Sequence, residues 1–315
     1  MIMCVLDGST HHQNRIKPML MRQVQLTLAG RLSLVAKRNF ANFAALLLLS
    51  LTVLWHAPLL AHEFWMVPAP AQQSVGSKLL LSLMVGEQFQ GDMVGVSRQQ
   101  TAGLRHYSTA GMIDLLPQLH TRPAGDFAVV LNVPGTHLIA FESSPNTLTL
   151  SPDSFNAYLH DEGLDFIKDQ RKAAGTAGQP GRERYTRYVK ALVSAPLDAG
   201  THAGSTIYAT PAGQRLELLP LTNPLLLVPL DALRVRVEFE GKPLAGALVK
   251  AWHRHSGQTV MIRATTTAEG IATVTLPFEG AWMVSVVHMV AAQGVKNIDW
   301  DSSWGNLSFV LPAGK

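Results

Sequence analysis

The residues with the clearest chemical potential are histidines, and His62 is the most unusual of them because it directly follows the most apolar run in the chain. If the chain is cut just before His62, the freed α-amine and the imidazole could together chelate one metal ion. A histidine from elsewhere would complete a three-nitrogen set suited to copper or nickel. His137 and His288 each lie in a strand-like run, where a rigid sheet would hold a ligand. We therefore predict a metal site formed by His62, His137 and His288.

Three carboxylates add oxygen atoms to this set. Glu63, Asp299 and Asp301 are candidate oxygen ligands, or acceptors for the imidazole N–H groups around a metal. A competing interpretation needs no metal, because a histidine after a leader can simply be exposed and a lone histidine in a strand is commonly a hydrogen-bonded core or surface residue. A neighbouring pair of acids, Asp161 and Glu162, is interpreted as ordinary charge on the surface of a helix.

The sequence carries none of the common catalytic signatures. It has no Gly-x-Ser-x-Gly elbow, no His-Glu-x-x-His zinc helix and no glycine-rich phosphate loop. A hydrolase and a nucleotide cofactor therefore have no motif to support them, and we expect a protein that is not an enzyme. The catalytic alternative is a copper-dependent oxidative enzyme with an amino-terminal histidine brace, as in the lytic polysaccharide monooxygenases.

A leader precedes His62. Lys37 and Arg38 are followed by about a dozen apolar residues and then by the small residue Ala61, which is the order of a secretory signal peptide. The apolar run is shorter than the roughly 20 residues that a membrane-spanning helix needs. We predict cleavage after Ala61 and export to the periplasm, with residues 1–61 as the leader. The alternative is a membrane anchor formed by an uncleaved leader, because Leu59 is unusual at the third position before a cut.

Removal of the leader changes the charge of the chain. The whole sequence has 26 basic and 22 acidic residues, and residues 62–315 keep 20 basic and 21 acidic ones. The net charge of the mature chain is then close to zero, which gives no support to nucleic-acid binding. Cys4, the single cysteine of the chain, leaves with the leader. Disulfides, thiolate metal sites and a cysteine nucleophile are thereby excluded from the mature protein.

The first part of the mature chain is predicted to be rich in strands. Residues 77–86 form one strand-like run, and residues 126–145 form two runs around a Pro-Gly turn. Residues 151–171 have a capping serine and apolar residues on one face, which predicts a helix that breaks at Gly163. Tyrosine and aliphatic residues at helical spacing predict a second helix over residues 182–193. We therefore expect an N-terminal β-rich domain, residues 62–215, with a two-helix insertion near residues 152–193.

From residue 216 onward the pattern is that of strands alone. Residues 232–240 alternate apolar and charged side chains, and residues 265–289 supply two more strands that place Trp282 inside a sheet. No helices alternate with these strands, so a parallel nucleotide-binding sheet is not expected. The prediction is a mainly β protein whose C-terminal domain, residues 216–315, is an immunoglobulin-like or transthyretin-like β-sandwich.

Several segments in a fixed order resemble one known family. They are "AHEFWMVP", "FNAYLHDEGL", "GRERYTRYVKALV", "GQRLELLPLTNP", "GKPLAGALV", "EGIATV", "GAWMVSVVHM" and "DWDSSWGNLSF". Together they cover nearly all of the mature chain, and they resemble the exported proteins of the domain of unknown function 4198 (DUF4198) family. This group is also described as periplasmic components of cobalt or nickel transport systems.

The resemblance implies an accessory role in the uptake or handling of a divalent transition metal such as nickel, cobalt or copper. The expected partners are the metal ion and a membrane transporter or an outer-membrane receptor. The alternative is a non-catalytic binding or scaffold module at the cell envelope, whose sandwich domain would contact a receptor or a surface glycan.

Overall fold

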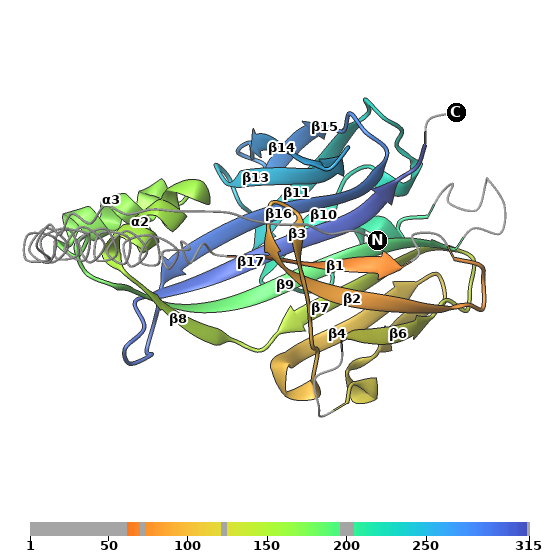
Figure 1. Cartoon of the computed structure of the whole chain (residues 1–315), viewed down its shortest axis with the longest axis horizontal. Helices are drawn as coiled ribbons and strands as arrows, with labels where there is room; N and C mark the ends of the chain where they lie inside the picture. The colour runs from red at the N-terminus through yellow and green to blue at the C-terminus, as the bar shows by residue number, and fades with distance from the viewer. Residues whose placement is uncertain (1–61, 70–72, 121–124, 196–204, 314–315) are drawn as a thin grey trace, which may run out of the picture. The chain divides into compact units, whose positions relative to one another are not determined.

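The computed structural model describes residues 62–69, 73–120, 125–195 and 205–313 (Figure 1). The predicted signal peptide, residues 1–61, lies outside the described residues. These described residues form one compact unit. None of the helices in the described ranges is long and apolar enough to cross a membrane.

A nine-stranded sheet runs through the whole unit. Its order is β14-β13-β16-β17-β9-β7-β4-β5, and β8 also pairs with β9. All its neighbours are antiparallel except β17 and β9, which run parallel. The strands are β4 (Thr101–Ser108), β5 (Gly111–Asp114), β7 (Gly135–Ser143), β8 (Asn146–Leu150), β9 (Gly181–Ala195), β13 (Leu248–His255), β14 (Gln258–Thr265), β16 (Gly280–Ala291) and β17 (Trp300–Leu311). This sheet takes strands from both sides of the boundary predicted between residues 215 and 216.

Two four-stranded sheets accompany the large one. The first consists of β1 (Glu63–Ala69), β2 (Lys78–Glu87), β3 (Gln90–Val94) and β6 (Asp126–Val130). The second consists of β10 (Leu216–Pro220), β11 (Ala232–Phe239), β12 (Lys242–Pro243) and β15 (Ile271–Thr275). The prediction of a mainly β protein is confirmed, while the immunoglobulin-like or transthyretin-like topology stays a prediction.

The apolar core forms separate clusters. One cluster joins the second small sheet to β13, β16 and β17, and it contains the fully buried Trp282 on β16. Another joins the first small sheet to β4, β7 and β9. Buried aliphatic and aromatic side chains on both faces of the large sheet thus supply the main stabilisation of a chain without disulfides.

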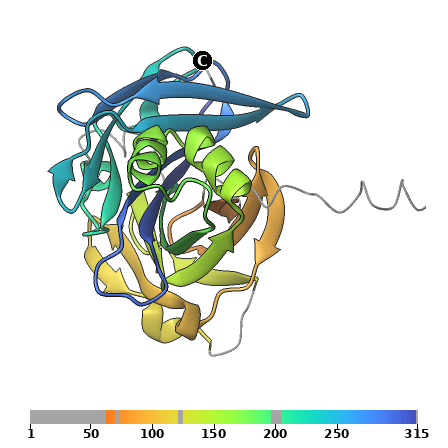
Figure 2. The same cartoon turned by 90° about the vertical axis from the view of Figure 1, so that its left-hand side faces the viewer.

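Two helices lie together at one end of the molecule (Figures 1 and 2). They are α2 (Pro152–Asp161) and α3 (Asp165–Ala173), and the side chain of Ser151 caps the first by accepting a hydrogen bond from the Ser154 N–H. Gly163 has a φ of +70° between them, where a side chain would be strained. The predicted helix with a break at Gly163 is confirmed.

The second predicted helix, residues 182–193, is wrong: these residues belong to β9. Every residue from 188 to 195 is buried, because β9 lies between β17 and β7 with apolar clusters on both faces. Val189 and Val193 pack into one cluster, while Tyr188 and Leu192 pack into the other. A strand that is buried on both faces does not alternate apolar and polar residues. The spacing of its tyrosine and aliphatic residues was therefore compatible with a helix.

Candidate functional site

His62 lies immediately before β1, and its imidazole faces a carboxylate. The antiparallel pairing of β1 with β2 places Glu63 opposite Gly86, so Glu87 at the end of β2 comes beside His62. The His62 Nε2 to Glu87 Oε1 distance is 3.6 Å, and the side chains are 49% and 39% exposed. This distance is longer than a hydrogen bond, and a small rotation of either exposed side chain would shorten it.

His137 lies on β7 and is fully buried. Its Nδ1 lies 2.8 Å from Nε2 of His106, and its own Nε2 lies 2.9 Å from the carbonyl oxygen of Val133. A carbonyl can only accept, so His137 Nε2 carries the proton and His106 Nε2 donates to His137 Nδ1. Burial and the neighbouring His137 lower the pKa of His106 to about 4. Both ring nitrogens of His137 are therefore engaged within the protein.

His288 lies on β16 between two aromatic rings. Its ring centroid is 4.5 Å from that of Phe239 and 6.0 Å from that of Phe166. Burial, followed by the positive charge of Arg215, lowers the pKa of His288 to about 4. Among the described residues no three histidine or acidic side chains are arranged to hold a metal ion, so the structure does not bring His62, His137 and His288 into one group.

The predicted oxygen ligands Asp299 and Asp301 each pair with an arginine of β9. Arg182 donates to Asp299 through Nε at 2.9 Å and Nη2 at 2.5 Å. Arg184 makes the same two-pronged contact with Asp301, at 2.7 and 2.8 Å. These bidentate pairs occupy both oxygens of each carboxylate and join β9 to the start of β17.

Glu63, the third predicted acid, lines a cavity of about 190 Å³. The cavity lies among the start of β1, the end of β2, the end of α2 and the strands β13 and β14. It is lined by Glu63, Glu87, Gln88, Tyr158, Asp161, Glu162, Lys250, Trp252, Met261 and Arg263. Four acidic and two basic side chains face it, so its charge favours a cation.

A buried cluster of three charges forms one wall of this cavity. Lys250 Nζ lies 2.6 Å from Glu162 Oε2 and 3.6 Å from Glu63 Oε1. Glu63 also accepts a hydrogen bond of 2.9 Å from the Ser285 hydroxyl. All three charged side chains are less than 10% exposed. One lysine therefore faces two carboxylates away from bulk water.

Burial and the charges of Lys250 and Glu63 change the pKa of Glu162. Burial raises the pKa of the Glu162 carboxyl to about 7; the charge of Lys250 opposes this rise, and that of Glu63 adds to it. Tyr158 beside it stays protonated, because burial and the nearby Glu183 and Glu162 raise its pKa well above its usual value. Glu162 can thus take up or release a proton near neutral pH at the wall of a cavity.

Two members of this cluster, Glu162 and Lys250, were not predicted from the sequence. Glu162 was expected on a helix surface, but it ends α2 facing the sheet and is 7% exposed. Lys250 was not singled out, although it stands between apolar residues in the strand-like segment Leu248–His255, where a charged side chain needs a partner. That flanking pattern is the signal that could have found it. Glu87 gave no signal, since only the pairing of β1 with β2 brings it to His62.

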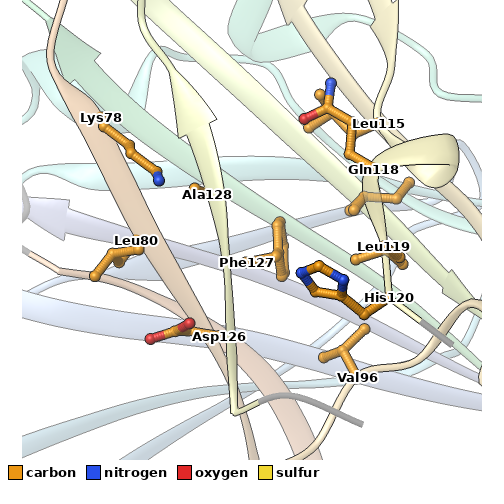
Figure 3. Close-up of a pocket in the computed structure, with 11 residues that line it drawn as sticks. Lys78, Leu80, Val96, Leu115, Gln118, Leu119, His120, Asp126, Phe127 and Ala128 are labelled. Carbon is orange, nitrogen blue, oxygen red and sulfur yellow. The ribbon is translucent and has the colours of Figure 1, made fainter. Parts of the chain in front are cut away.

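A second cavity, of about 290 Å³, lies between β2, β6 and the segment that ends at His120 (Figure 3). Phe127 and the imidazole of His120 lie close together in this view, with Leu119 beside them. The buried lining is apolar, whereas the polar side chains that line it are exposed. It lacks the buried charges that distinguish the cavity beside His62.

Comparisons with known proteins identify a family. The model of the family described as "Domain of unknown function (DUF4198)" matches residues 59–290, so the chain belongs to this family. No curated protein matches the sequence.

Three solved structures show distant likenesses. Murine CEACAM1b is 10% identical, with a TM-score of 0.19 over 80% of this chain and 100% of that one. A tetra-tandem repeat of a large adhesion protein is 12% identical, with a TM-score of 0.19 over 79% of this chain and 49% of that one. The E. coli alpha-2-macroglobulin is 11% identical, with a TM-score of 0.19 over 80% of this chain and 17% of that one.

Proposed function

We propose that this member of the DUF4198 family is an exported, non-catalytic protein that binds a divalent transition-metal ion at the amino terminus released by cleavage after Ala61. The ion would be nickel, cobalt or copper, handled as cargo in the periplasm. The observation that carries the proposal is the approach of His62 to Glu87 at the rim of the acidic cavity. A membrane transporter or an outer-membrane receptor would be the partner in metal uptake.

The donor atoms fit such an ion. The α-amine and the imidazole Nδ1 of His62 would form a chelate, leaving Nε2 to donate its proton to Glu87. Metal-binding histidines commonly donate their second ring nitrogen to a carboxylate, which fixes the tautomer and the ring orientation. Nitrogen ligands suit nickel and copper, and the exposure of both side chains leaves the ion a route in and out.

Two of the three predicted histidine ligands are left out of this proposal, as are Asp299 and Asp301, which are engaged by arginines. Both ring nitrogens of His137 already have partners inside the sheet. His288 packs against Phe166 and Phe239, and within the described residues it belongs to no set of three histidine or acidic groups that could hold a metal ion. The acidic side chains of the cavity, including Glu63, would attract the cation by their negative charge and would not coordinate it directly.

A second function is favoured by the aromatic side chains of the same cavity. Tyr158 and Trp252 line it together with the carboxylates, a combination that suits a small organic cation. The protein would then be a binding module without a metal.

A copper-dependent oxidase would use the same amino-terminal chelate, and it would consume oxygen in a reductant-dependent manner when loaded with copper.

Titration calorimetry with copper, nickel and cobalt tests the metal site. His62→Ala should abolish tight binding, and Glu87→Gln should weaken it by about 10- to 100-fold, the usual effect of losing a carboxylate behind a histidine ligand. His160→Ala is the matched control, because the His160 imidazole also faces a carboxylate, Asp165, at 3.1 Å on an exposed surface. Unchanged affinity in His62→Ala would overturn the metal site and leave the organic ligand as the better proposal.

A further inference from the structure

A separate cavity lies where α3 and the following loop meet the start of β17, and it holds two arginines. Its volume is about 270 Å³, and Arg171, Arg182, Asp299 and Trp300 are part of its lining. Arg171 comes from the last turn of α3 and is only 2% exposed. Arg182, the second arginine of the lining, is 46% exposed. None of these residues takes part in the proposed metal site.

The guanidinium of Arg171 is incompletely satisfied. Its Nη2 donates to the carbonyl oxygens of Gln179 at 2.6 Å and Ala177 at 3.4 Å, and its central carbon lies 4.8 Å from the centre of the Phe155 ring. Its Nε is buried and has no hydrogen-bond partner. A guanidinium cannot escape burial by losing its proton, so a charge without a counter-ion is costly at this position.

The nearest acid does not supply that counter-ion. Within the described ranges, no carboxylate comes within ion-pair distance of Arg171. Asp299 acts on Arg171 only at longer range, where its charge opposes the lowering of the Arg171 pKa by burial. Both oxygens of Asp299 already accept hydrogen bonds from Arg182. The cavity therefore contains two guanidinium groups and one carboxylate, with one positive charge in excess.

We propose that this cavity binds a small organic monocarboxylate, whose carboxylate group meets Arg171 and Arg182 and whose apolar body lies against Trp300. A single negative charge balances the excess positive charge, whereas a phosphate at neutral pH would bring more. Asp299 engages Nε and Nη2 of Arg182, so Arg182 would offer its remaining Nη1 donor, while Arg171 has an unpartnered Nε. Guanidinium N–H groups form strong charge-assisted hydrogen bonds with a carboxylate. Trp300 and Pro180 give the lining an apolar part, which favours a ligand with a flat ring over a bare ion.

Benzoate is the probe for this site, and calorimetry on the full mature chain measures its binding. Arg182→Gln should weaken benzoate binding at least about tenfold, because it removes one donor group and leaves the Asp299 charge unpaired beside the ligand. Arg184→Gln is the matched control: it breaks the equivalent pair with Asp301 two residues further along the same strands, outside the cavity lining. Both arginines pair at partly exposed positions, so both variants should fold.

Arg171→Gln is the stronger variant, provided that its thermal melt shows a folded protein. It should also lose benzoate binding, and benzoate should raise the melting temperature of the wild type and of Arg184→Gln but not of Arg182→Gln. Acetate should bind more weakly than benzoate. The proposal is overturned if benzoate gives no binding heat, if the Arg182→Gln and Arg184→Gln variants bind it equally, or if phosphate binds more tightly than benzoate.

Discussion

Two buried lysines of the large sheet have opposite surroundings. Lys190 on β9 is 1% exposed and faces one carboxylate, Glu217, at 2.5 Å, and it also donates to the carbonyl oxygen of Leu218 at 3.2 Å. Lys250 on β13 is 4% exposed but faces two carboxylates, Glu63 and Glu162, at the wall of a cavity. Burial alone therefore does not distinguish a structural charge from one at a candidate site.

The difference lies in the balance of charge. In the core, Lys190 has one carboxylate, Glu217, within ion-pair distance, and the amide of Ala212 also donates to Glu217. Glu238 acts on Lys190 only at longer range and has its own partner, Arg236, at 3.7 Å. At Lys250 two carboxylates lie within ion-pair distance of one lysine, beside a space open to a ligand, and Arg187 acts on Glu63 only at longer range. A balanced buried pair holds the fold in one arrangement, while an unbalanced one can respond to protons or to a cation.

The largest expected effect comes from breaking the balanced pair. Lys190→Met should lower the free energy of unfolding by about 3–5 kcal/mol, because Glu217 would remain buried without a counter-charge. Urea denaturation of the variant and the wild type at neutral pH measures this difference. A loss under about 1 kcal/mol would show that water reaches Glu217.

Lys250→Met should lower the free energy of unfolding by less, about 2 kcal/mol at pH 7. The pKa of Glu162 is already about 7, so at this pH Glu162 can take up a proton at a small cost in free energy. Protonation removes one of the two carboxylate charges that the variant leaves unpaired. The same urea denaturation, repeated at pH 6 and pH 8, should show a larger cost at the higher pH. A cost equal to that of Lys190→Met and independent of pH would remove the distinction between the two lysines.

The smallest effect is a change in the slope of stability against pH. The Glu162 pKa rises from its ordinary 4.5 to about 7 on folding, so the folded protein holds an extra proton between these pH values. This proton stabilises the fold at low pH, and the stabilisation is lost as the pH rises toward 7. Glu162→Gln removes this dependence.

The free energy of unfolding of Glu162→Gln, relative to that of the wild type, should therefore increase by up to about 1 kcal/mol per pH unit between about pH 5 and pH 7. Denaturant melts across this range measure the gain. Asp161→Gln or Asp161→Asn serves as a control, because Asp161 lines the same cavity but is exposed. Parallel stability curves for the wild type and Glu162→Gln would show that Glu162 is ionised throughout.

The parts of the fold that the sequence predicted are those with a local signal. The break between α2 and α3 follows from Gly163, and the strand around Trp282 follows from its apolar and β-branched neighbours. Strand β9 was misread because its signal is not local: its neighbours β7 and β17 cover it from distant parts of the chain. Only the tertiary structure shows that both faces of β9 are covered by other parts of the chain.

The candidate site was predictable only around His62. His62 could be singled out from its place after the predicted leader, and Glu63 from its place beside it. Glu87 reaches His62 through strand pairing, and Glu162 reaches Lys250 through the docking of α2 on the sheet. These contacts join residues far apart in the chain, and no spacing in the sequence encodes them.

In the proposed metal site, the free amino group of His62 is one of the ligands. The most direct test compares two forms of the protein by calorimetry with copper, nickel and cobalt: the chain that begins at His62, and the same chain that keeps Ala61 before it. The extra residue moves the amine away from the imidazole, so we expect at least about a tenfold loss of metal affinity in the longer form. Equal affinity in the two forms would contradict the proposed site.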